Sequence, residues 1–215
     1  FPGPVPPARA AGANRAGAGV FHALLDSGFD GGRTVPYDGS APTHPLNVYG
    51  ASKQEGERAI AASGALALTL RTSWIYARHG QNFLVTMQKS AATRSELRVV
   101  ADQTGVPNWS RALARATARL VAQGTSYIAE RAGLYHLSAR GQATWYDFAR
   151  AIIGNDTSVR VTPITTADYP TPARRPAYGV LAATRFAGTC GFGLPDGQIL
   201  LHEFLHAQPE PRPLP

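Results

Sequence analysis

Two residues suited to proton transfer, Tyr49 and Lys53, stand four positions apart in a segment that reads as the start of a helix. At this spacing both side chains lie on one face of the helix, one turn apart. A free tyrosine has a pKa of about 10, which makes it a poor acid or base at neutral pH. A lysine ammonium one turn away favours the phenolate and lowers the pKa of the tyrosine. The pair predicts a proton-transfer site that can also hold ribose hydroxyls, with an ordinary amphipathic helix as the alternative.

The elements around this pair indicate how it is positioned. Its helix is expected to run to about Ala62 and to end at Ser63-Gly64. Residues 20–25 are an apolar run compatible with a buried strand. Residues 66–72 are nearly all apolar, as expected of a parallel strand that is covered on both faces.

The rest of the chain continues the alternation of strands and helices. Helices are expected near residues 82–93, 111–123, 144–153 and 198–206, and strands at 97–100 and 134–137. Ser110 is expected to cap the helix near residues 111–123, and Gly124 to follow its end. Thr144 and Gly154 are expected to bound the helix at residues 144–153. The alternation predicts an α/β fold with a parallel sheet.

The composition is that of a soluble globular protein. The 215 residues are 44% hydrophobic and 16% charged, and no apolar run approaches the roughly 18 residues that span a membrane. We find no charged, apolar and small-residue leader. The single cysteine, Cys190, excludes an internal disulfide framework. These features predict a cytoplasmic protein without a membrane partner.

The net charge of +7 raises the question of a nucleic-acid partner. The arginines are scattered, and Arg174-Arg175 is the only adjacent pair. We therefore expect no nucleic-acid binding and interpret the charge as a solvated basic surface. A nucleotide-diphosphate ligand is the functional alternative.

Several motifs surround the Tyr49–Lys53 pair in a fixed order. They are Phe29-Asp30-Gly31-Gly32, Thr43-His44-Pro45-Leu46, Leu70–Tyr76, Asp102–Pro107, Gly133–Leu137, Thr144–Ala149 and Pro172–Pro176. In this order and spacing they resemble the extended short-chain dehydrogenase/reductases that act on nucleotide sugars, and most closely the dTDP-4-dehydrorhamnose reductases. The resemblance spans about Phe29 to Leu205.

The resemblance implies part of a doubly wound, Rossmann-like parallel sheet interleaved with a small C-terminal substrate-binding lobe. The expected organisation is an irregular N-terminus (1–19), the remainder of an NADP-binding domain (20–137, of which 77–109 contribute to the substrate lobe), the substrate-binding lobe (138–207) and a Pro-rich tail (208–215).

The resemblance also implies a reaction, the NADPH-dependent reduction of the 4-keto group of dTDP-6-deoxy-L-lyxo-4-hexulose. The product is dTDP-L-rhamnose, used for cell-surface polysaccharide. NADH is the alternative cofactor. Some members of the family require Mg²⁺ and form homodimers, but we identify no metal ligands in the sequence.

By the same resemblance, Tyr49 would protonate the forming alkoxide, and Lys53 would lower the pKa of Tyr49 and hold the ribose. The residues expected to contact the cofactor are Tyr49, Lys53, Thr72 and Ser73. Those expected to contact the dTDP-sugar are Trp74, Asn82, Arg174 and Arg175. A core position is the alternative for Trp74.

The sequence departs from the family at several points, including Asn108 in place of the usual threonine after Asp102–Pro107. Leu25 stands where the family has a catalytic threonine, so one hydrogen bond to the substrate carbonyl is missing unless Ser27 supplies it. Tyr178-Gly179-Val180 replaces a more polar segment. The start of the chain lacks the glycine-rich turn that binds a pyrophosphate. We therefore expect that roughly the first third of a complete reductase is absent and that the chain alone does not reduce substrate with NADPH.

Two other functions stay open. A catalytically inert relative that acts as a binding or regulatory subunit would explain Leu25 and the missing turn. A nucleotide-sugar epimerase of the same superfamily would share Tyr49 and Lys53 but should lack Arg174-Arg175-Pro176.

One motif suggests a different chemistry. His202-Glu203-Phe204-Leu205-His206 is a formal His-Glu-x-x-His zinc motif. A zinc protease needs a third protein ligand, typically well downstream, whereas nine residues follow His206. The apolar residues around the motif favour an ordinary amphipathic closing helix.

Overall fold

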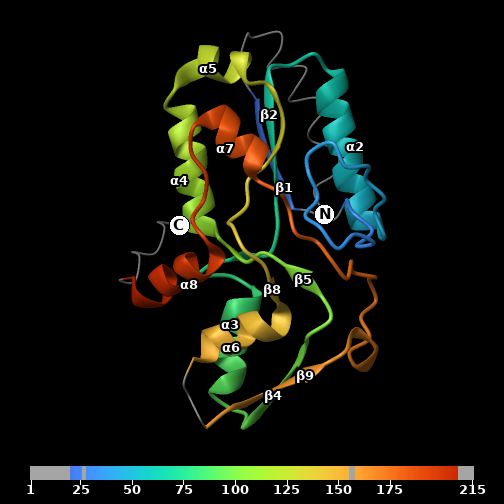
Figure 1. Cartoon of the computed structure of the whole chain (residues 1–215), viewed down its shortest axis with the longest axis vertical. Coiled ribbons are helices and arrows are strands. Elements are labelled where there is room, and N and C mark those ends of the chain that lie inside the picture. Colours follow the sequence, from blue (N-terminus) through green and yellow to red (C-terminus); the bar gives the residue numbers. More distant parts are fainter. Residues whose placement is uncertain (1–19, 26–27, 155–157, 208–215) are drawn as a thin grey trace.

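A parallel three-stranded sheet forms the centre of the upper part of the molecule (Figure 1). This computed structural model describes residues 20–25, 28–154 and 158–207. The strands β1 (Val20–Leu25), β2 (Ala67–Thr72) and β7 (Gly133–His136) lie in the order β1-β2-β7. Leu25 pairs with Thr72 and Arg71 with His136. The expected α/β fold with a parallel sheet is confirmed.

Helices lie on both sides of this sheet. Helix α2 (Val48–Ala62) lies on one side, and α4 (Ser110–Val121), α5 (Gly124–Glu130) and α7 (Thr184–Cys190) lie on the other (Figure 1). Side chains alternate between the two faces of a strand. Leu68 and Leu70 of β2 therefore join the apolar core, whereas Thr69 and Arg71 point to the opposite face.

The lower part of the molecule contains three helices and three pairs of short strands. The helices are α3 (Phe83–Ala91), α6 (Trp145–Ile153) and α8 (Gly197–His206). The pairs are β3 (Ile75–Tyr76) with β6 (Asn108–Trp109), β4 (Glu96–Val100) with β9 (Arg160–Ile164), and β5 (Thr104–Gly105) with β8 (Ala143–Thr144). The 3-10 helix η1 (Thr166–Asp168) follows β9.

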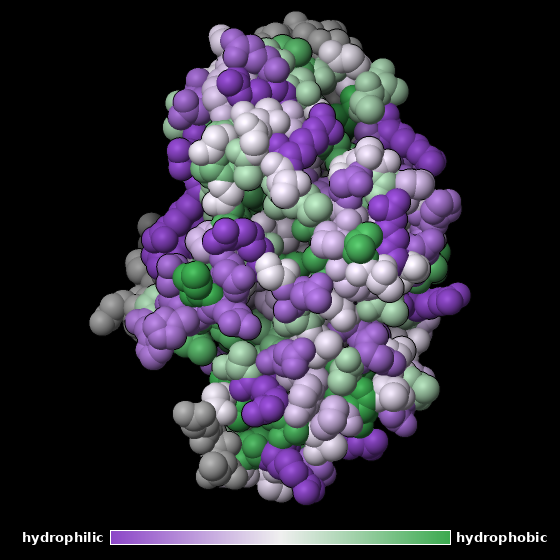
Figure 2. All heavy atoms as spheres, in the orientation of Figure 1, coloured by the Kyte–Doolittle hydropathy of each residue, from purple (hydrophilic) through white to green (hydrophobic). Residues whose placement is uncertain are grey.

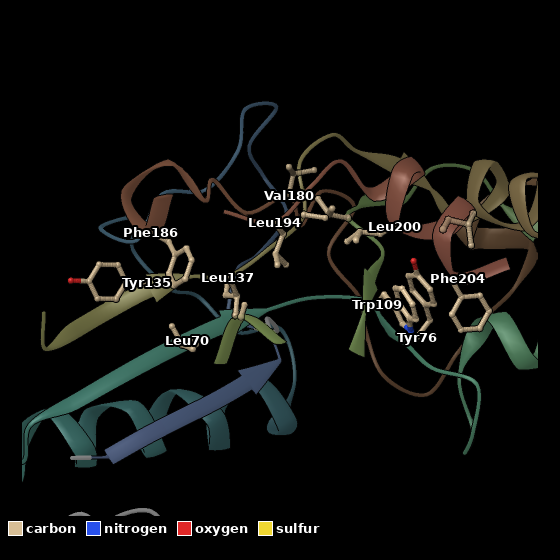
Figure 3. Close-up of a cluster of buried hydrophobic side chains, with 14 of the residues drawn as sticks. Leu70, Tyr76, Trp109, Tyr135, Leu137, Val180, Phe186, Leu194, Leu200 and Phe204 are labelled. Carbon is tan, nitrogen blue, oxygen red and sulfur yellow. The ribbon is translucent and has the colours of Figure 1, made fainter. Parts of the chain in front are cut away.

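One cluster of buried side chains runs through both parts. Figure 3 shows Leu70, Tyr135 and Phe186 at one end of the cluster and Trp109 and Phe204 at the other. Continuous apolar burial of this kind is the main source of folding free energy. The sheet and the lower helices are thus held by a shared core.

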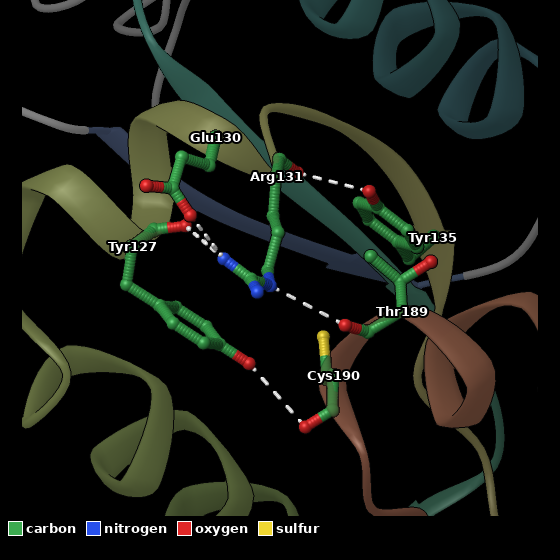
Figure 4. A network of polar contacts seen from close by, with 6 residues as sticks. All are labelled: Tyr127, Glu130, Arg131, Tyr135, Thr189 and Cys190. Carbon is green, nitrogen blue, oxygen red and sulfur yellow. Dashed lines mark hydrogen bonds and ion pairs between the residues drawn. The ribbon is translucent and has the colours of Figure 1, made fainter.

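A polar network joins α5, β7 and α7 at the end of the sheet where β7 begins (Figure 4). Arg131 bonds to Glu130 Oε2 at 2.9 Å and donates through Nε to the Thr189 carbonyl at 3.3 Å. The Tyr135 hydroxyl donates to the Arg131 carbonyl, and the Tyr127 hydroxyl donates to the Cys190 carbonyl. These bonds fix the loop ends of helices that are too short to be stable alone.

The prediction for the region of α4 was wrong in one detail. Ser110 does not cap the helix but is its first residue, because Trp109 is paired in β6 and α4 starts directly after it. Gly124 lies beyond the end of the helix, as expected. Its φ of +85° lets the chain turn and begin α5 at once. The expected Thr144 cap and Gly154 stop of α6 are confirmed.

Two observations concern possible partners of the chain: how hydrophobic residues are distributed on its surface, and how long its helices are. On the face shown in Figure 2, hydrophobic residues are scattered among polar ones. None of the described helices is long and apolar enough to span a membrane.

Candidate functional site

The first turn of α2 lies at the carboxyl ends of the sheet strands. Because β1 and β2 are parallel and α2 connects them, the helix must run back along the sheet and start near Leu25 and Thr72. Asn47 caps the helix, accepting a hydrogen bond from the Gly50 amide at 2.8 Å. Open parallel sheets bind ligands at this edge. Tyr49 is therefore placed where a ligand is expected.

The Tyr49–Lys53 pair has the predicted helical geometry. The Lys53 ammonium lies over the Tyr49 ring, 5.0 Å from its centre. Both side chains are partly buried. Burial raises the pKa of Tyr49, which is opposite to the lowering expected from Lys53. The Lys53 ammonium faces the Tyr49 ring, and the removal of the phenol from water is the larger effect on the pKa of Tyr49. Tyr49 is therefore a protonated phenol at neutral pH.

Thr72 and Ser73 form the end of β2 and are both buried. Thr72 Oγ1 has no hydrogen-bond partner among the described residues. A buried hydroxyl without a partner costs free energy, which a bound polar ligand group can recover. Ser73 Oγ donates to the Val106 carbonyl at 3.1 Å. Thr72 Oγ1 is thus buried without a partner among the described residues, and Ser73 is fixed by the neighbouring loop.

Asn108 holds the loops at this edge together, a role that sequence reasoning missed. Its fully buried side-chain amide donates to the carbonyls of Ser73 and Val106, each at 2.9 Å. Its Oδ1 accepts from the Ala139 amide at 2.7 Å. One side chain therefore joins the strand-end loops that follow β2, β5 and β7. The available signal was an asparagine within the otherwise apolar segment around it.

Trp74 has an unusual backbone conformation directly after Ser73. Its φ is 40°, and it is the only residue other than glycine with a positive φ in the described ranges. The indole stacks on Trp145, with ring centres 3.5 Å apart and an angle of 7° between the planes. A Cβ on Gly105 would lie 2.6 Å from Trp74 Nε1, so glycine is required there. Strain of this kind is typical of ligand sites.

The arginine-containing segment lies beside the start of α2. Asn47 Nδ2 donates to the Arg174 carbonyl at 3.0 Å. Gly31, at a φ of +80°, packs against Pro176 and the Ala177 amide. The Arg174 and Arg175 side chains are exposed. The capping residue of the Tyr49 helix is thus bonded directly to the segment that carries both arginines.

The same segment also reaches the loop beneath Trp74. The Thr104 amide donates to the Ala177 carbonyl, and the Gly179 amide donates to the Thr104 carbonyl, both at 2.8 Å. Thr104 precedes Gly105, on which the Trp74 indole lies. The structure therefore connects Tyr49, Trp74 and Arg174 through short, named contacts.

The expected substrate residue Asn82 is engaged in local structure. Its Oδ1 caps α3 by accepting from the Val85 amide at 3.2 Å, and its Nδ2 donates to the Ala77 and His79 carbonyls. These bonds give it a structural role as helix cap. The backbone of Leu25 pairs with Thr72, but its side chain, like Ser27, lies outside the described residues. The expected irregular N-terminus and Pro-rich tail also lie outside them.

Metal chemistry receives no support from the described residues. They contain no group of three or more His, Cys, Asp or Glu side chains that could hold a metal ion. His202 and His206 are exposed on α8 with ring centres 4.3 Å apart. A two-histidine pair is too small a ligand set for a structural or catalytic zinc. Neither the Mg²⁺ implied by resemblance nor a zinc site follows from this arrangement.

The residues expected to contact the cofactor lie at this edge, but the described residues contain no cradle for a pyrophosphate. Among the described residues, no strand leads through a glycine-rich turn into a helix. Such turns hold the pyrophosphate of a dinucleotide.

Two charged residues near the site were not predicted. Glu57 follows Lys53 by one helical turn, and its carboxylate is bonded to the Arg71 guanidinium beneath α2. The sequence signal for this contact was an arginine within the apolar strand Leu68–Thr72.

Comparison with known proteins identifies relatives over almost the whole chain. A dTDP-4-dehydrorhamnose reductase from Burkholderia thailandensis is 42% identical over 199 residues, which cover 87% of this chain and 67% of the relative. The crystal structure of a dTDP-4-dehydrorhamnose reductase from Clostridium acetobutylicum gives a TM-score of 0.85 at 33% identity, over 93% of this chain and 69% of that one.

A second structure adds a bound cofactor. The dTDP-4-dehydrorhamnose reductase from Bacillus anthracis, solved in complex with NADP, gives a TM-score of 0.82 at 30% identity, over 93% of this chain and 69% of that one. The chain therefore spans about two thirds of the length of these relatives.

The family model described as the RmlD substrate binding domain matches residues 6–208. With a match of this length, and with a relative of this identity, the chain belongs to the RmlD substrate binding domain family.

Proposed function

We propose that this chain provides the proton donor and the sugar-nucleotide site of an NADPH-dependent dTDP-4-dehydrorhamnose reductase. The observation that carries the proposal is the Asn47 side chain, which caps the helix of Tyr49 and binds the Arg174 carbonyl. This contact supports the proposal because it joins the cap of the Tyr49 helix to the backbone of the segment that carries both arginines. The activities of the Burkholderia, Clostridium and Bacillus relatives support the proposal.

Tyr49 is the proton donor in this mechanism. Its pKa is raised by burial, so the phenol keeps its proton at neutral pH until an acceptor forms. NADPH, when bound, supplies the hydride that reduces the 4-keto carbon. Tyr49 then gives its proton to the resulting alkoxide oxygen. Lys53, over the Tyr49 ring, stabilises the phenolate that remains and can hold the ribose hydroxyls.

The remaining contacts divide between cofactor and substrate. Thr72 Oγ1, buried and without a described partner, fits a polar group of the cofactor, and Ser73 fixes the adjoining loop. NADH is the alternative cofactor. Arg174 and Arg175 bind the pyrophosphate of the dTDP-sugar, because guanidinium groups match phosphate oxygens in charge and geometry. Trp74 provides an aromatic surface for the sugar.

Binding of the nucleotide is testable in residues 1–215 without any cofactor. In saturation-transfer NMR, dTDP should give signals that weaken when Arg174 and Arg175 are both replaced by Ala. The expected loss of affinity is about tenfold or more, from charge-assisted hydrogen bonds of roughly 1.5–3 kcal/mol each. Arg160→Ala removes an exposed arginine of β9 and is the matched control. Equal binding by all three proteins would contradict the role of the arginines.

Turnover requires a protein with a complete cofactor site. A hybrid that joins the part of the Burkholderia relative outside the matched region to residues 20–215 should oxidise NADPH in the presence of the dTDP-4-keto sugar. The product should be dTDP-L-rhamnose. Binding of dTDP without turnover in the hybrid would instead support the inert binding subunit. Inversion of a sugar centre without net oxidation of NADPH would support the epimerase.

The cytoplasmic location and the homodimer are further parts of this proposal. They are carried by the family resemblance. Sedimentation of the purified chain measures directly whether it forms a homodimer.

A further inference from the structure

Helix α2 has few apolar contacts that could fix its position. Of its fifteen residues, Gly50 and Ile60 are the buried ones. Val48, next to Tyr49, is 86% exposed. A helix usually docks on a sheet through a wide apolar stripe. Apolar burial is thus limited to these two positions, so polar contacts contribute to fixing where the helix lies on the sheet.

A buried ion pair supplies such a contact. Arg71 Nε and Nη2 bond to the two carboxylate oxygens of Glu57, each at 2.6 Å. The side chains of Arg71 and Glu57 are 8% and 11% exposed. The guanidinium also lies 5.4 Å from the centre of the Phe29 ring. A two-pronged bond between planar groups allows one relative orientation, unlike an apolar contact, which tolerates sliding.

The pair joins the two elements that form the candidate site. Tyr49, Lys53 and Glu57 follow one another at one-turn spacing and share a face of α2. Arg71 directly precedes Thr72 and Ser73 at the end of β2. The ion pair therefore fixes the position of α2, which carries Tyr49, along β2, which leads to the candidate cofactor residues.

Two imidazoles also lie near the pair, and neither carries a charge at neutral pH that competes with Arg71. His136 pairs with Arg71 across the strands, and burial lowers its pKa to about 4. His22 of β1 also has a lowered pKa, chiefly through burial. Both imidazoles are mainly neutral at pH 7, so Arg71 is the cation that balances the buried Glu57 carboxylate among these groups.

We propose that Glu57 and Arg71 are positioning residues that hold Tyr49 and Lys53 in register with the end of β2. The inference rests on the proposed function, because it takes Tyr49 as the proton donor. Exchange of a whole buried ion pair for apolar side chains of similar size is often nearly neutral for stability, whereas removal of one partner leaves a buried unpaired charge. Exchange of the whole pair should therefore displace the helix more than it destabilises the fold.

The first test observes Tyr49 directly and needs no turnover. Tyrosine labelled with ¹³C at the ring carbon that bears the hydroxyl gives one NMR signal per residue, and Tyr49→Phe identifies the signal of Tyr49. In residues 1–215, Glu57→Gln should shift this signal and move the pKa of Tyr49 by about half a unit or more. Amide hydrogen exchange in the first turns of α2 should become about tenfold faster.

The same helix offers a matched control. Glu55 forms an exposed ion pair with Arg58 at 2.8 Å, with side chains 69% and 64% exposed. Glu55→Gln removes the same charge from the same helix and should leave the Tyr49 signal and its pKa unchanged. An equal response in Glu55→Gln and Glu57→Gln would overturn the proposal, because a general charge effect would then explain both.

A second variant separates position from stability. Replacing Glu57 by Leu and Arg71 by Met together exchanges the ion pair for apolar side chains of similar size. We expect this protein to fold with a Tm near that of the parent but with a displaced Tyr49 signal. A Tyr49 signal and pKa like those of the parent would overturn the proposal, as would a failure of both Glu57→Gln and the double variant to fold.

In the hybrid enzyme, Glu57→Gln should lower kcat by about a hundredfold with little change in KM, as expected for a misplaced catalytic group. An unchanged kcat would contradict the positioning role even if the hybrid is active. Absence of activity in the parent hybrid would count against the proposed function alone, because the NMR measurement does not depend on it.

Discussion

The Lys53 ammonium lies 5.0 Å from the centre of the Tyr49 ring, one helical turn further along α2. This contact places the cation over the ring while burial keeps the pKa of the phenol above its ordinary value. The resting protein thus holds a protonated tyrosine beside a cation. That combination suits a proton donor better than a base.

Replacement of Tyr49 by Phe should abolish most of the turnover of the hybrid enzyme. Without the phenolic proton, kcat should fall by roughly a hundredfold or more, as measured by NADPH oxidation. Binding of dTDP should persist. Tyr169→Phe is the control, since Tyr169 is 60% exposed and outside the candidate site. Activity of Tyr49→Phe within a few-fold of the parent would exclude this residue as the donor.

The variant Asn47→Ser should distinguish the contributions of the two hydrogen bonds of the Asn47 side chain, one to the Gly50 amide and one to the Arg174 carbonyl. Serine can still cap α2, so stability should change little, whereas Asn47→Ala should cost about 1 kcal/mol. Serine cannot donate to the Arg174 carbonyl, so the arginine segment loses its tether to the helix. We expect KM for the dTDP-sugar to rise in Asn47→Ser with kcat nearly unchanged. A KM equal to that of the parent would show that the tether does not position the arginines.

His136 should make the protein less stable in mild acid. Burial lowers its pKa to about 4 in the folded chain, while the unfolded chain binds the proton near the ordinary pKa of 6.5. Between these values the unfolded state holds more protons, so stability falls as the pH falls from 6.5 towards 4. The loss from this residue is about 3 kcal/mol.

Urea unfolding at a series of pH values measures this effect. His136→Gln cannot gain a proton, so its unfolding free energy should decline less steeply over the same range. Parallel pH profiles for the parent and His136→Gln would contradict the assignment.

Gly105→Ala should destabilise the protein through Trp74. The new methyl group would lie 2.6 Å from Trp74 Nε1, in a region closed by Trp145. Overpacking of this kind costs typically 1–3 kcal/mol. Gly188→Ala in α7 meets no atom within 4 Å and should instead stabilise by up to about 1 kcal/mol. Thermal unfolding compares the two, and a Tm for Gly105→Ala at or above that of the parent would be inconsistent with the close approach.

The His-Glu-x-x-His segment should behave as a structural helix. Leu200, Leu201 and Phe204 of α8 are buried, whereas His202 and His206 face solvent. Addition of zinc or a chelator should leave the Tm unchanged, and no peptidase activity should appear. Stoichiometric zinc in elemental analysis that disappears in His202→Ala would reopen the metalloprotease hypothesis.

The sequence predicted the elements whose patterns are local. The apolar run of β2 and the Tyr49–Lys53 helix with its Ser63-Gly64 end are recovered in the structure because strand and helix periodicity are set by neighbouring residues. The short helices α5 and α7 and the two-residue strands were missed. Their conformations are imposed by tertiary contacts, such as the pairing of Tyr76 with Trp109.

The candidate site shows the same limit more clearly. The identities of Tyr49, Trp74 and Arg174 could be inferred from motifs, and their roles stay predictions. The bond from Asn47 to Arg174 joins residues 127 positions apart, and no periodicity encodes such a contact. The Glu57–Arg71 pair and the positive φ of Trp74 likewise depend on the folded environment. The sequence therefore identified the candidate residues, but not the contacts that hold them in place.

The stacked indoles of Trp74 and Trp145 have an optical consequence. Two of the three tryptophans of the chain lie face to face, 3.5 Å apart. At this separation their electronic transitions couple, so the pair absorbs and emits light as one chromophore, while Trp109 contributes separately from its edge contact with Phe204. Because this pair lies just beyond the end of β2, we expect tryptophan emission to change when a ligand occupies that edge.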